Sequence, residues 1–473
     1  LTQKRSVESC IRSRSAVAMN PQIFREYDIR GLVDTDLTDD VVLNLGRGLA
    51  TMVKRAGGSS VVVGRDARTH GQRFRDVFIS GVTQTGLDVI DVGVVPTPVV
   101  YYAANTLPVD GLAVITGSHN PPEYNGFKMG VGKTTFYGQT IQELRKLIER
   151  QDFDVGRTGK VSTFDAVTPY LHFVTSTVRP AGRKMKVVVD AGNGVGGIVS
   201  IPMLEKLGYD VVPIFCEPDG RFPNHHADPT VAKNLEHLIA EVRRQKADLG
   251  VAYDGDADRI GVVDEKGEII WGDRLMILLS RAVLAEVPGA AIVGEVKCSF
   301  TMYDDITAHG GKAVMWKTGH SLIKAKMKEL NAQLAGEMSG HIFYKNRFFG
   351  FDDAPYTAAR LLEILSHDNR PISSMLADVP LTYSSPELRV DTLEEKKFAL
   401  VARCTEMLRA KGLQLVEVDG VRATWPDGWG LIRASNTTPL LVVRYEAKTK
   451  DRLAEIAALI DGTIAAAKKE IGG

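Results

Sequence analysis

Residues 249–259 read LGVAYDGDADR, an apolar run that changes abruptly into a loop rich in aspartate. Five apolar residues are enough for a buried β-strand and too few for an ordinary helix. The next residues, IGVVDEKGEII at 260–270, have the pattern of a hairpin. The stretch therefore predicts a strand whose carboxyl end presents several carboxylates.

The same succession of strand and polar loop recurs along the chain. The further runs are VVVGRDAR (61–68), LDVIDVGVVPTP (87–98), GLAVITGSHN (111–120), KVVVDAGNG (186–194), YDVVPIFCEPDG (209–220), AIVGEVKCS (291–299), KAVMWKTGHS (312–321) and AQLAGEMSGH (332–341). Helical patterns lie between them, as at 231–245 and 321–330. Such alternation indicates α/β layers. We expect three similar α/β domains with mixed, mostly parallel sheets.

The last part of the chain has a different pattern. Residues near 380–473 read strand, helix, strands, helix, which predicts a C-terminal α+β domain. We place the domains at 19–166, 167–268, 269–378 and 379–473. Ligands of open α/β sheets bind at the carboxyl ends of strands, so one loop from each domain is expected to face a central cleft. Residues 1–18 are basic and Ser-rich without an apolar core, and are expected to be a leader or a disordered extension.

Composition narrows the class of protein. The 473 residues include 58 Lys+Arg and 58 Asp+Glu, and the formal net charge is zero. A general nucleic-acid or membrane-surface binder would carry a basic excess, and no apolar run could span a bilayer. The four cysteines are scattered without CxxC spacing, which argues against a zinc module or a disulfide framework. We expect a cytoplasmic, monomeric protein that binds neither nucleic acid nor membrane.

The acidic loop after residue 253 has the chemistry of a metal site. Asp254, Asp256 and Asp258 alternate in a short loop, and Mg²⁺ prefers a few carboxylates together with phosphate oxygens. An EF-hand loop is the rival interpretation, and Glu265 falls at its twelfth position. However, Arg259 stands where that loop needs glycine, and a hairpin follows instead of a helix. A metal site is therefore favoured over a solvated acidic turn.

Three other loops carry candidate functional groups, each with a plain turn as its alternative. Ser118 follows the apolar strand GLAVI, where a hydroxyl can act as a nucleophile or carry a phosphoryl group. Glu337 and Ser339 lie in GEMSGH and could hydrogen-bond sugar hydroxyls. In RASNTT at 433–438, an arginine, hydroxyls and backbone amides have the composition of a phosphate cradle.

A glycine-rich segment offers a competing function. GNGVGG at 192–197 matches GxGxxG after a strand, and Glu217 ends the next strand where a dinucleotide fold places its ribose-binding acid. Tight packing between strand and helix is the alternative explanation. The pair His225 and His226 lies in a Pro-rich loop and is interpreted as structural.

Taken together, the loops resemble the α-D-phosphohexomutase family, and specifically its bacterial phosphomannomutase/phosphoglucomutase branch. FREYDIRG (24–31), TGSHNP (116–121), DGDADR (254–259), GEMSGH (336–341) and RASNTTP (433–439) occur in the family's order. The resemblance covers the chain from about Pro21 to its end.

The resemblance implies a role for each loop. Ser118 would be carried as phosphoserine, and an oxygen of that phosphoserine would join Asp254, Asp256 and Asp258 in binding Mg²⁺. Candidate acid/base or charge-stabilising groups are His119 and Lys128, with Arg259 and Arg30 adding positive charge. The residues implied in substrate binding are Tyr27, Lys297, His320, Glu337, Ser339, His341, Arg433, Ser435, Asn436, Thr437 and Arg444.

The implied activity is reversible phosphoryl transfer between hexose 1-phosphate and hexose 6-phosphate of glucose, mannose or both. Phospho-Ser118 would donate to the free hydroxyl, and a hexose 1,6-bisphosphate would turn over in the site before returning the other phosphate. Glucose 1,6-bisphosphate would act as activator and intermediate. The alternatives are a Mg²⁺-dependent sugar phosphatase and a phosphoglucosamine mutase, although Met338 stands where the latter branch usually has Gln.

Overall fold

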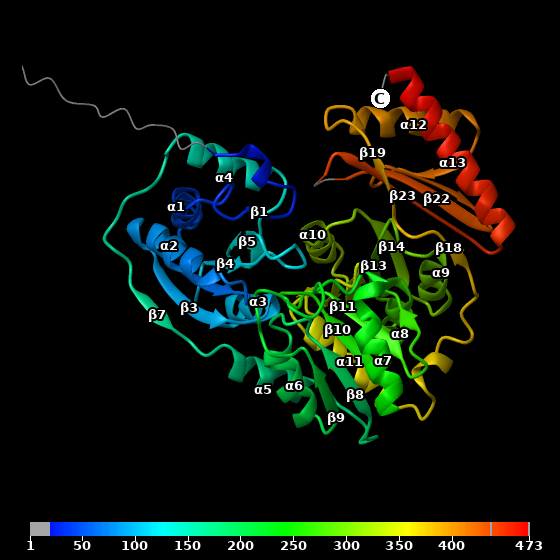
Figure 1. Ribbon diagram of the computed structural model, residues 1–473, viewed down its shortest axis with the longest axis horizontal. Coiled ribbons are helices and arrows are strands. Elements are labelled where there is room, and N and C mark those ends of the chain that lie inside the picture. The colour runs from blue at the N-terminus through cyan, green and yellow to red at the C-terminus, as the bar shows by residue number, and fades with distance from the viewer. Residues whose placement is uncertain (1–18, 436–437, 472–473) are drawn as a thin grey trace, which may run out of the picture.

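The computed structural model describes residues 19–435 and 438–471. It contains four β-sheets, each with its own helices, and the chain passes through them in order (Figure 1). Asn436 and Thr437, which the sequence places in the phosphate cradle, lie outside the described residues, as does the expected leader.

The first domain is built on a seven-stranded sheet with the strand order β1-β5-β4-β2-β3-β7, and β6 pairs with β5. Thr38 caps α1 by accepting a hydrogen bond from the amide of Val41, and aspartates in the first turn suit the positive end of the helix dipole. The elements are η1 (Pro21–Ile23), β1 (Ile29–Leu32), α1 (Asp39–Arg55), β2 (Ser60–Arg65), α2 (Gly71–Gln84), β3 (Asp88–Val94), α3 (Thr97–Thr106), β4 (Gly111–Ile115), β5 (Tyr124–Val131), β6 (Thr134–Thr135), α4 (Gln139–Glu149) and β7 (Val161–Thr163).

The second domain has a five-stranded sheet in the order β12-β11-β10-β8-β9. Strand β10 is buried along its whole length, as its apolar sequence predicted, and it runs parallel to β8 and antiparallel to β11. The elements are α5 (Val167–Thr177), β8 (Lys186–Asp190), α6 (Gly197–Lys206), β9 (Asp210–Ile214), η2 (Ala232–Leu235), α7 (Glu236–Gln245), β10 (Leu249–Tyr253), β11 (Ile260–Asp264) and β12 (Ile269–Ile270).

The third domain repeats this arrangement in the order β14-β13-β15-β16-β17. Its elements are α8 (Gly272–Glu286), β13 (Ala291–Glu295), α9 (Phe300–Ala308), β14 (Lys312–Trp316), α10 (His320–Leu330), β15 (Leu334–Gly336), β16 (Ile342–Tyr344), β17 (Phe351–Asp352), α11 (Ala354–Ser366) and η3 (Ile372–Ser374). In all three domains the first parallel strand lies between the second and the third, and a fourth strand pairs antiparallel with the third. The internal repeat read from the sequence is therefore a repeat of topology.

The C-terminal domain is an antiparallel sheet covered on its outer side by α12 and α13 (Figure 1). Its elements are β18 (Tyr383–Ser384), β19 (Leu388–Asp391), α12 (Lys397–Ala410), β20 (Gln414–Val416), β21 (Val421–Trp425), β22 (Gly428–Ala434), β23 (Leu440–Ala447) and α13 (Lys450–Ile471). The α+β prediction is confirmed, but the sequence had not separated β20 and β21 from the loop before β22. These strands are short and only partly apolar, so they gave a weak signal.

The apolar cores show which domains are packed against one another. One continuous cluster runs from α3 in the first domain through the second domain into the helices of the third. The last domain has a core of its own, and it meets the third domain through a small cluster around Val296, Trp429 and Leu431. Among the described residues, no helix is long and apolar enough to cross a membrane.

Candidate active site

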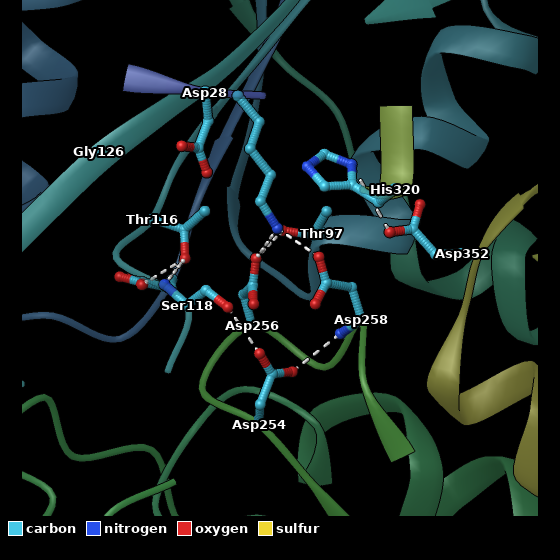
Figure 2. Close-up of polar contacts among 12 residues, drawn as sticks. Asp28, Thr97, Thr116, Ser118, Gly126, Asp254, Asp256, Asp258, His320 and Asp352 are labelled. Carbon is cyan, nitrogen blue, oxygen red and sulfur yellow. Dashed lines mark hydrogen bonds and ion pairs between the residues drawn. The ribbon is translucent and has the colours of Figure 1, made fainter. Parts of the chain in front are cut away.

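The loop after β4 brings Ser118 against the second domain. Its hydroxyl donates a 2.6 Å hydrogen bond to Asp254 Oδ2 (Figure 2). The same hydroxyl lies 3.1 Å from Nδ1 of His119. Ser118 has a φ of 48°, a left-handed conformation that costs a residue with a side chain about 1–2 kcal/mol. The serine predicted from sequence and the acidic loop therefore meet directly.

The acidic loop after β10 gathers three buried carboxylates. Oxygens of Asp254, Asp256 and Asp258 lie within 4.8 Å of one another. Asp254 Oδ1 accepts from the amides of Asp258 and Arg259, whereas Oδ1 of Asp256 and of Asp258 has no hydrogen-bond partner. Buried carboxylate oxygens without a donor are suited to a hard cation. The residues present therefore fit a Mg²⁺ site.

Lys128, on β5, is the cation that faces these carboxylates. Its ammonium contacts Asp256 Oδ2 at 2.7 Å and also Asp258 Oδ2. Burial opposes the charge, but Asp256 and Asp258 outweigh it and raise the pKa of Lys128 well above its ordinary value. Burial and the carboxylates of Asp258 and Asp256 raise the pKa of Asp254 well above its usual range. One ammonium against three carboxylates leaves room for a divalent cation.

Two arginines and two histidines surround the Ser118 loop. Arg30 donates to Asp28 at 2.7 Å and contacts the side chain of Asn120 in the serine loop. Arg259 donates from Nε to His341 Nε2 at 3.0 Å. Burial, with the charges of Arg259 and Arg30, holds the pKa of His119 well below its ordinary value. The ring of His119 is therefore a neutral group beside the hydroxyl.

Loops of the first and third domains close on each other at Thr318. Tyr27 donates its hydroxyl proton to the carbonyl of Thr318 at 2.7 Å, and its ring meets that of His320 edge-on. The amide of Gly319 donates to Glu337 Oε1 at 2.7 Å, while Ser339 donates to Glu337 Oε2 at 3.0 Å. The structure thus brings together four residues that the sequence assigned to substrate binding.

The last domain adds Arg433 to the same region. Arg433 donates from Nε to Asp419 Oδ2 at 2.9 Å, and the same oxygen accepts from the amide of Thr318 at 3.0 Å. Ser435 lies 2.7 Å from the hydroxyl of Thr438. Asp419 therefore links the third domain to the loop that carries the predicted phosphate cradle.

Two predicted substrate residues lie at the contact between the third and fourth domains. Arg444 donates to the carbonyl of Lys297 and lies 3.7 Å from Asp273. Lys297 pairs with Glu387 at 3.0 Å. Both side chains therefore make contacts that join the third domain to the fourth.

Several residues that organise the site were not found from the sequence. Glu295, the last residue of β13, accepts from Thr318 Oγ1 at 2.5 Å and from the amide of Met338. Asp352 Oδ2 lies 3.1 Å from Nδ1 of His341, and Arg68 lies under the Ser118 loop. Glu295 could have been found, because it follows the same strand-end pattern as Ser118. Asp352 had no local pattern, and Arg68 ends the strand-and-loop run VVVGRDAR but was not singled out there.

In the glycine-rich segment at 192–197, neighbouring protein atoms occupy the space next to the glycine backbone. A Cβ on Gly194 would lie 2.6 Å from the carbonyl oxygen of Gly255, and one on Gly196 would meet the ring of Tyr253. His225 contacts Asp190 at 3.1 Å, in agreement with a structural role. The glycines therefore permit close packing against the acidic loop, and a dinucleotide gains no support here.

Comparisons with known proteins agree with this arrangement. Models of the phosphoglucomutase/phosphomannomutase family match in order: alpha/beta/alpha domain I at residues 21–155, domain II at 168–267, domain III at 271–383 and the C-terminal domain at 387–463. These matches do not test the exact domain limits proposed above, which stay predictions.

Among curated relatives, a phosphomannomutase/phosphoglucomutase of Pseudomonas aeruginosa is 47% identical over 441 residues, covering 93% of this chain and 95% of its own length. A phosphoglucomutase of Neisseria meningitidis is 44% identical over 440 residues, covering 92% and 95%. A crystal structure of a phosphoglucomutase/phosphomannomutase family protein from Burkholderia thailandensis superposes with a TM-score of 0.91 at 42% identity, covering 95% of this chain and 98% of that one. With matches of this extent in all four domains, the chain belongs to the phosphoglucomutase/phosphomannomutase family.

Proposed function

We propose that the protein interconverts hexose 1-phosphates and hexose 6-phosphates of glucose, mannose or both, through phospho-Ser118 and a hexose 1,6-bisphosphate. The observation that carries this proposal is the 2.6 Å contact between Ser118 and Asp254. It places a hydroxyl that can carry phosphate beside three carboxylates from another domain. The names of the relatives at 44–47% identity support the same activity.

Asp254, Asp256 and Asp258 would hold the Mg²⁺, together with an oxygen of phospho-Ser118. When bound, the cation neutralises charge on the phosphoryl oxygens. Glucose 1,6-bisphosphate would serve as activator and intermediate.

The neighbouring side chains would stabilise negative charge and accept the proton of the sugar hydroxyl. In the first transfer the bond from phosphorus to Ser118 Oγ breaks as a bond to O1 or O6 of the sugar forms, and that sugar hydroxyl releases a proton. In the second transfer the bond from the other phosphorus to its sugar oxygen breaks as a bond to Ser118 Oγ forms, and the sugar oxygen takes up a proton. Lys128 stays charged, so its role is electrostatic stabilisation, shared with Arg30 and Arg259. His119 is neutral and can accept a proton, which makes it the better candidate for the base.

The sugar and its second phosphate would lie toward the third and fourth domains. Glu337 and Ser339 present oxygens suited to sugar hydroxyls, and the arginine of the last domain suits a phosphate. The proposed contacts are Tyr27, Lys297, His320, Glu337, Ser339, His341, Arg433, Ser435 and Arg444, with Asn436 and Thr437 added by sequence. The substrate must bind in two orientations, because either phosphate can lie at Ser118.

The test is an assay of glucose 1-phosphate conversion to glucose 6-phosphate, with Mg²⁺ and a trace of glucose 1,6-bisphosphate. Ser118→Ala should abolish nearly all turnover, and one phosphate seen in the intact mass of the wild type should be missing from the variant. Most activity remaining in Ser118→Ala would refute the carrier role. Release of inorganic phosphate at a comparable rate would favour the phosphatase, and preference for glucosamine 1-phosphate would favour the phosphoglucosamine mutase.

We further propose a cytoplasmic protein that acts as a monomer on a small phosphosugar. The absence of a basic excess supports a function that involves neither nucleic acid nor a membrane surface.

A further inference from the structure

Arg68 lies directly beneath the loop that carries Ser118. It follows β2 in the run VVVGRDAR, and its side chain is 0% exposed. Its Nη1 donates to the carbonyls of Pro121 and Tyr124 at 2.6 and 2.8 Å. Its Nη2 donates to the carbonyls of Ser118 and Asn120 at 2.9 and 2.5 Å. One guanidinium therefore holds four carbonyls of a single loop.

The loop needs such a partner because it has no regular structure between β4 and β5. Buried carbonyls require donors, and here a side chain supplies them in place of a neighbouring strand. A Cβ on Gly117 would lie 2.4 Å from Cζ of Arg68, so the loop backbone rests on the guanidinium without a gap. The fit depends on the flat, multiply donating shape of arginine.

Asp66 completes the support. It lies 3.3 Å from Nε of Arg68 and balances the buried charge. Its Oδ2 accepts from the hydroxyl of Thr116 at 2.7 Å and from the amide of Gly117. Thr116 in turn accepts from the amide of Ser118 at 2.8 Å. The backbone of Ser118 is thus held at its amide through Asp66 and at its carbonyl by Arg68.

The second domain is packed against the same segment. The ring of Phe222 lies 5.2 Å from Cζ of Arg68, and a Cβ on Gly220 would meet the carbonyl of Ala67 at 2.4 Å. On the other side of the serine, a Cβ on Gly255 would lie 2.4 Å from the carbonyl oxygen of Ser118. The serine loop is therefore held between Arg68 and the acidic loop.

We propose that Arg68 is the positioning residue for Ser118. By fixing the left-handed backbone at Ser118, it aims the hydroxyl at Asp254 and keeps the reacting oxygen in place for both directions of transfer. This inference rests on the proposed function, because it assigns Arg68 a part in the phosphoryl transfer of that same serine. Within the described part of the chain, the hydrogen bonds of Arg68 go to loop carbonyls and not to the reacting oxygen.

The test compares full-length Arg68→Lys, Arg68→Met and Arg68→Ala with matched Arg65 variants. Arg65 ends β2, and its side chain donates to Gln72 Oε1 and to the carbonyl of Asp66. For each protein, kcat and KM for glucose 1-phosphate, the melting temperature, and amide hydrogen exchange over residues 116–124 are measured. Arg68→Ala is also assayed with guanidinium chloride at tens of millimolar, against sodium chloride at equal ionic strength.

We expect the Arg68 variants to lose about 100-fold in kcat, as a displacement of roughly 1 Å can cause, with KM nearly unchanged. Exchange over 116–124 should rise, and guanidinium should restore part of the kcat of Arg68→Ala. The Arg65 variants should match the wild type. If Arg68→Ala does not fold, Arg68→Lys decides, because a single ammonium cannot serve four carbonyls.

Two results would overturn the inference. One is a kcat of Arg68→Met equal to that of Arg65→Met; the other is a loss that follows the melting temperature alone, without faster exchange in the loop. Failure of the proposed function would give a different result. The wild type and the Arg65 variants would then show no mutase turnover, while hydrogen exchange would still show whether Arg68 holds the loop.

Discussion

Each of the two loops that meet at the site contains a non-glycine residue with a left-handed backbone conformation. Ser118 and Ala257 both adopt left-handed φ values, 48° and 58°, in the two loops that meet at the site. Residues other than glycine adopt this region at a cost, so neighbouring contacts must impose it. Serine and alanine do not indicate a left-handed conformation in a sequence. The sequence therefore predicted that these loops exist but not their backbone conformation.

A buried carboxyl at the start of α11 gives the protein a specific pH dependence. Asp353 accepts from the amide of Tyr356 and from the hydroxyl of Tyr170, yet burial raises its pKa to about 8. Because an unfolded aspartate titrates near roughly 3.9, folding favours the protonated form. Its stabilising contribution is therefore complete below about pH 4 and is lost as the pH rises through about 8.

We predict that Asp353→Asn, which can still cap the helix but cannot ionise, gains stability over the wild type as the pH rises. The difference should grow by up to about 1.4 kcal/mol per pH unit between about pH 5 and 8, measured by urea unfolding. Asp165→Asn is the control, because Asp165 also caps a helix and its hydrogen bonds lower its pKa. Parallel stability curves for wild type and Asp353→Asn would contradict the prediction.

At the scale of elements, three of the four loops occupy one topological position. The serine loop joins β4 to β5, the acidic loop joins β10 to β11, and the Glu337 loop joins β15 to β16. Each connects the third parallel strand of its domain to an antiparallel fourth strand. The repeated topology therefore places a serine, a group of aspartates and a glutamate at equivalent positions of the three domains. The sequence was sufficient to predict this, because strands and their terminal loops have local patterns.

The supporting contacts could not be predicted in the same way. Glu295 binds a loop more than 20 residues away, and Arg68 binds carbonyls about 50 residues away. Pairs so distant in the chain leave no periodic pattern, and a carbonyl that needs a donor has no signature in a side chain. The positions of Lys297 and Arg444 likewise depend on how two domains meet.

The acidic loop should tolerate no side chain at Gly255. Since an added Cβ would lie 2.4 Å from the carbonyl oxygen of Ser118, Gly255→Ala must push the two loops apart. We expect turnover to fall by at least about 10-fold, a loss of roughly 1.4 kcal/mol in transition-state stabilisation, in a protein that still folds. The steady-state assay and thermal melting check this.

Gly462→Ala is the matched control, because a Cβ there meets nothing within 4 Å in the middle of α13. That change should leave turnover unaltered and stabilise the fold by about 0.5–1 kcal/mol. Normal turnover in Gly255→Ala would show that the serine and acidic loops are not as closely fitted as the structure places them.

At the scale of the whole molecule, one apolar cluster runs through the first three domains, while the fourth meets the third through a small apolar cluster and a set of polar contacts. Arg422 is buried, donates to the carbonyls of Val296 and Cys298 at 2.6 and 2.8 Å, and stacks on Trp429. Glu446 accepts from Ser299 and from the indole of Trp429. Directional hydrogen bonds of this kind fix an orientation between two domains more strictly than apolar area alone.

Asp419 connects this orientation to substrate binding. Asp419→Ala removes the acceptor shared by Arg433 and the amide of Thr318, so the proposed phosphate cradle should lose its alignment with the third domain. We expect KM for glucose 1-phosphate to rise by about tenfold, equivalent to roughly 1.4 kcal/mol. Asp427→Ala, which breaks a surface pair with Arg452 in the same domain, should leave KM unchanged. An unchanged KM in Asp419→Ala would exclude this link.

The spread of the site along the chain also sets a timetable for its assembly. Ser118 leaves the ribosome about 300 residues before Arg433, an interval of roughly 15–60 s at ordinary rates of synthesis. During this interval the first three domains can fold around the apolar cluster that runs through them. The proposed phosphate cradle of the last domain has not yet been synthesised. A nascent chain at that stage would contain the proposed carrier serine, the acidic loop and the Glu337 loop but not the proposed phosphate cradle, so we expect it to bind a phosphosugar weakly.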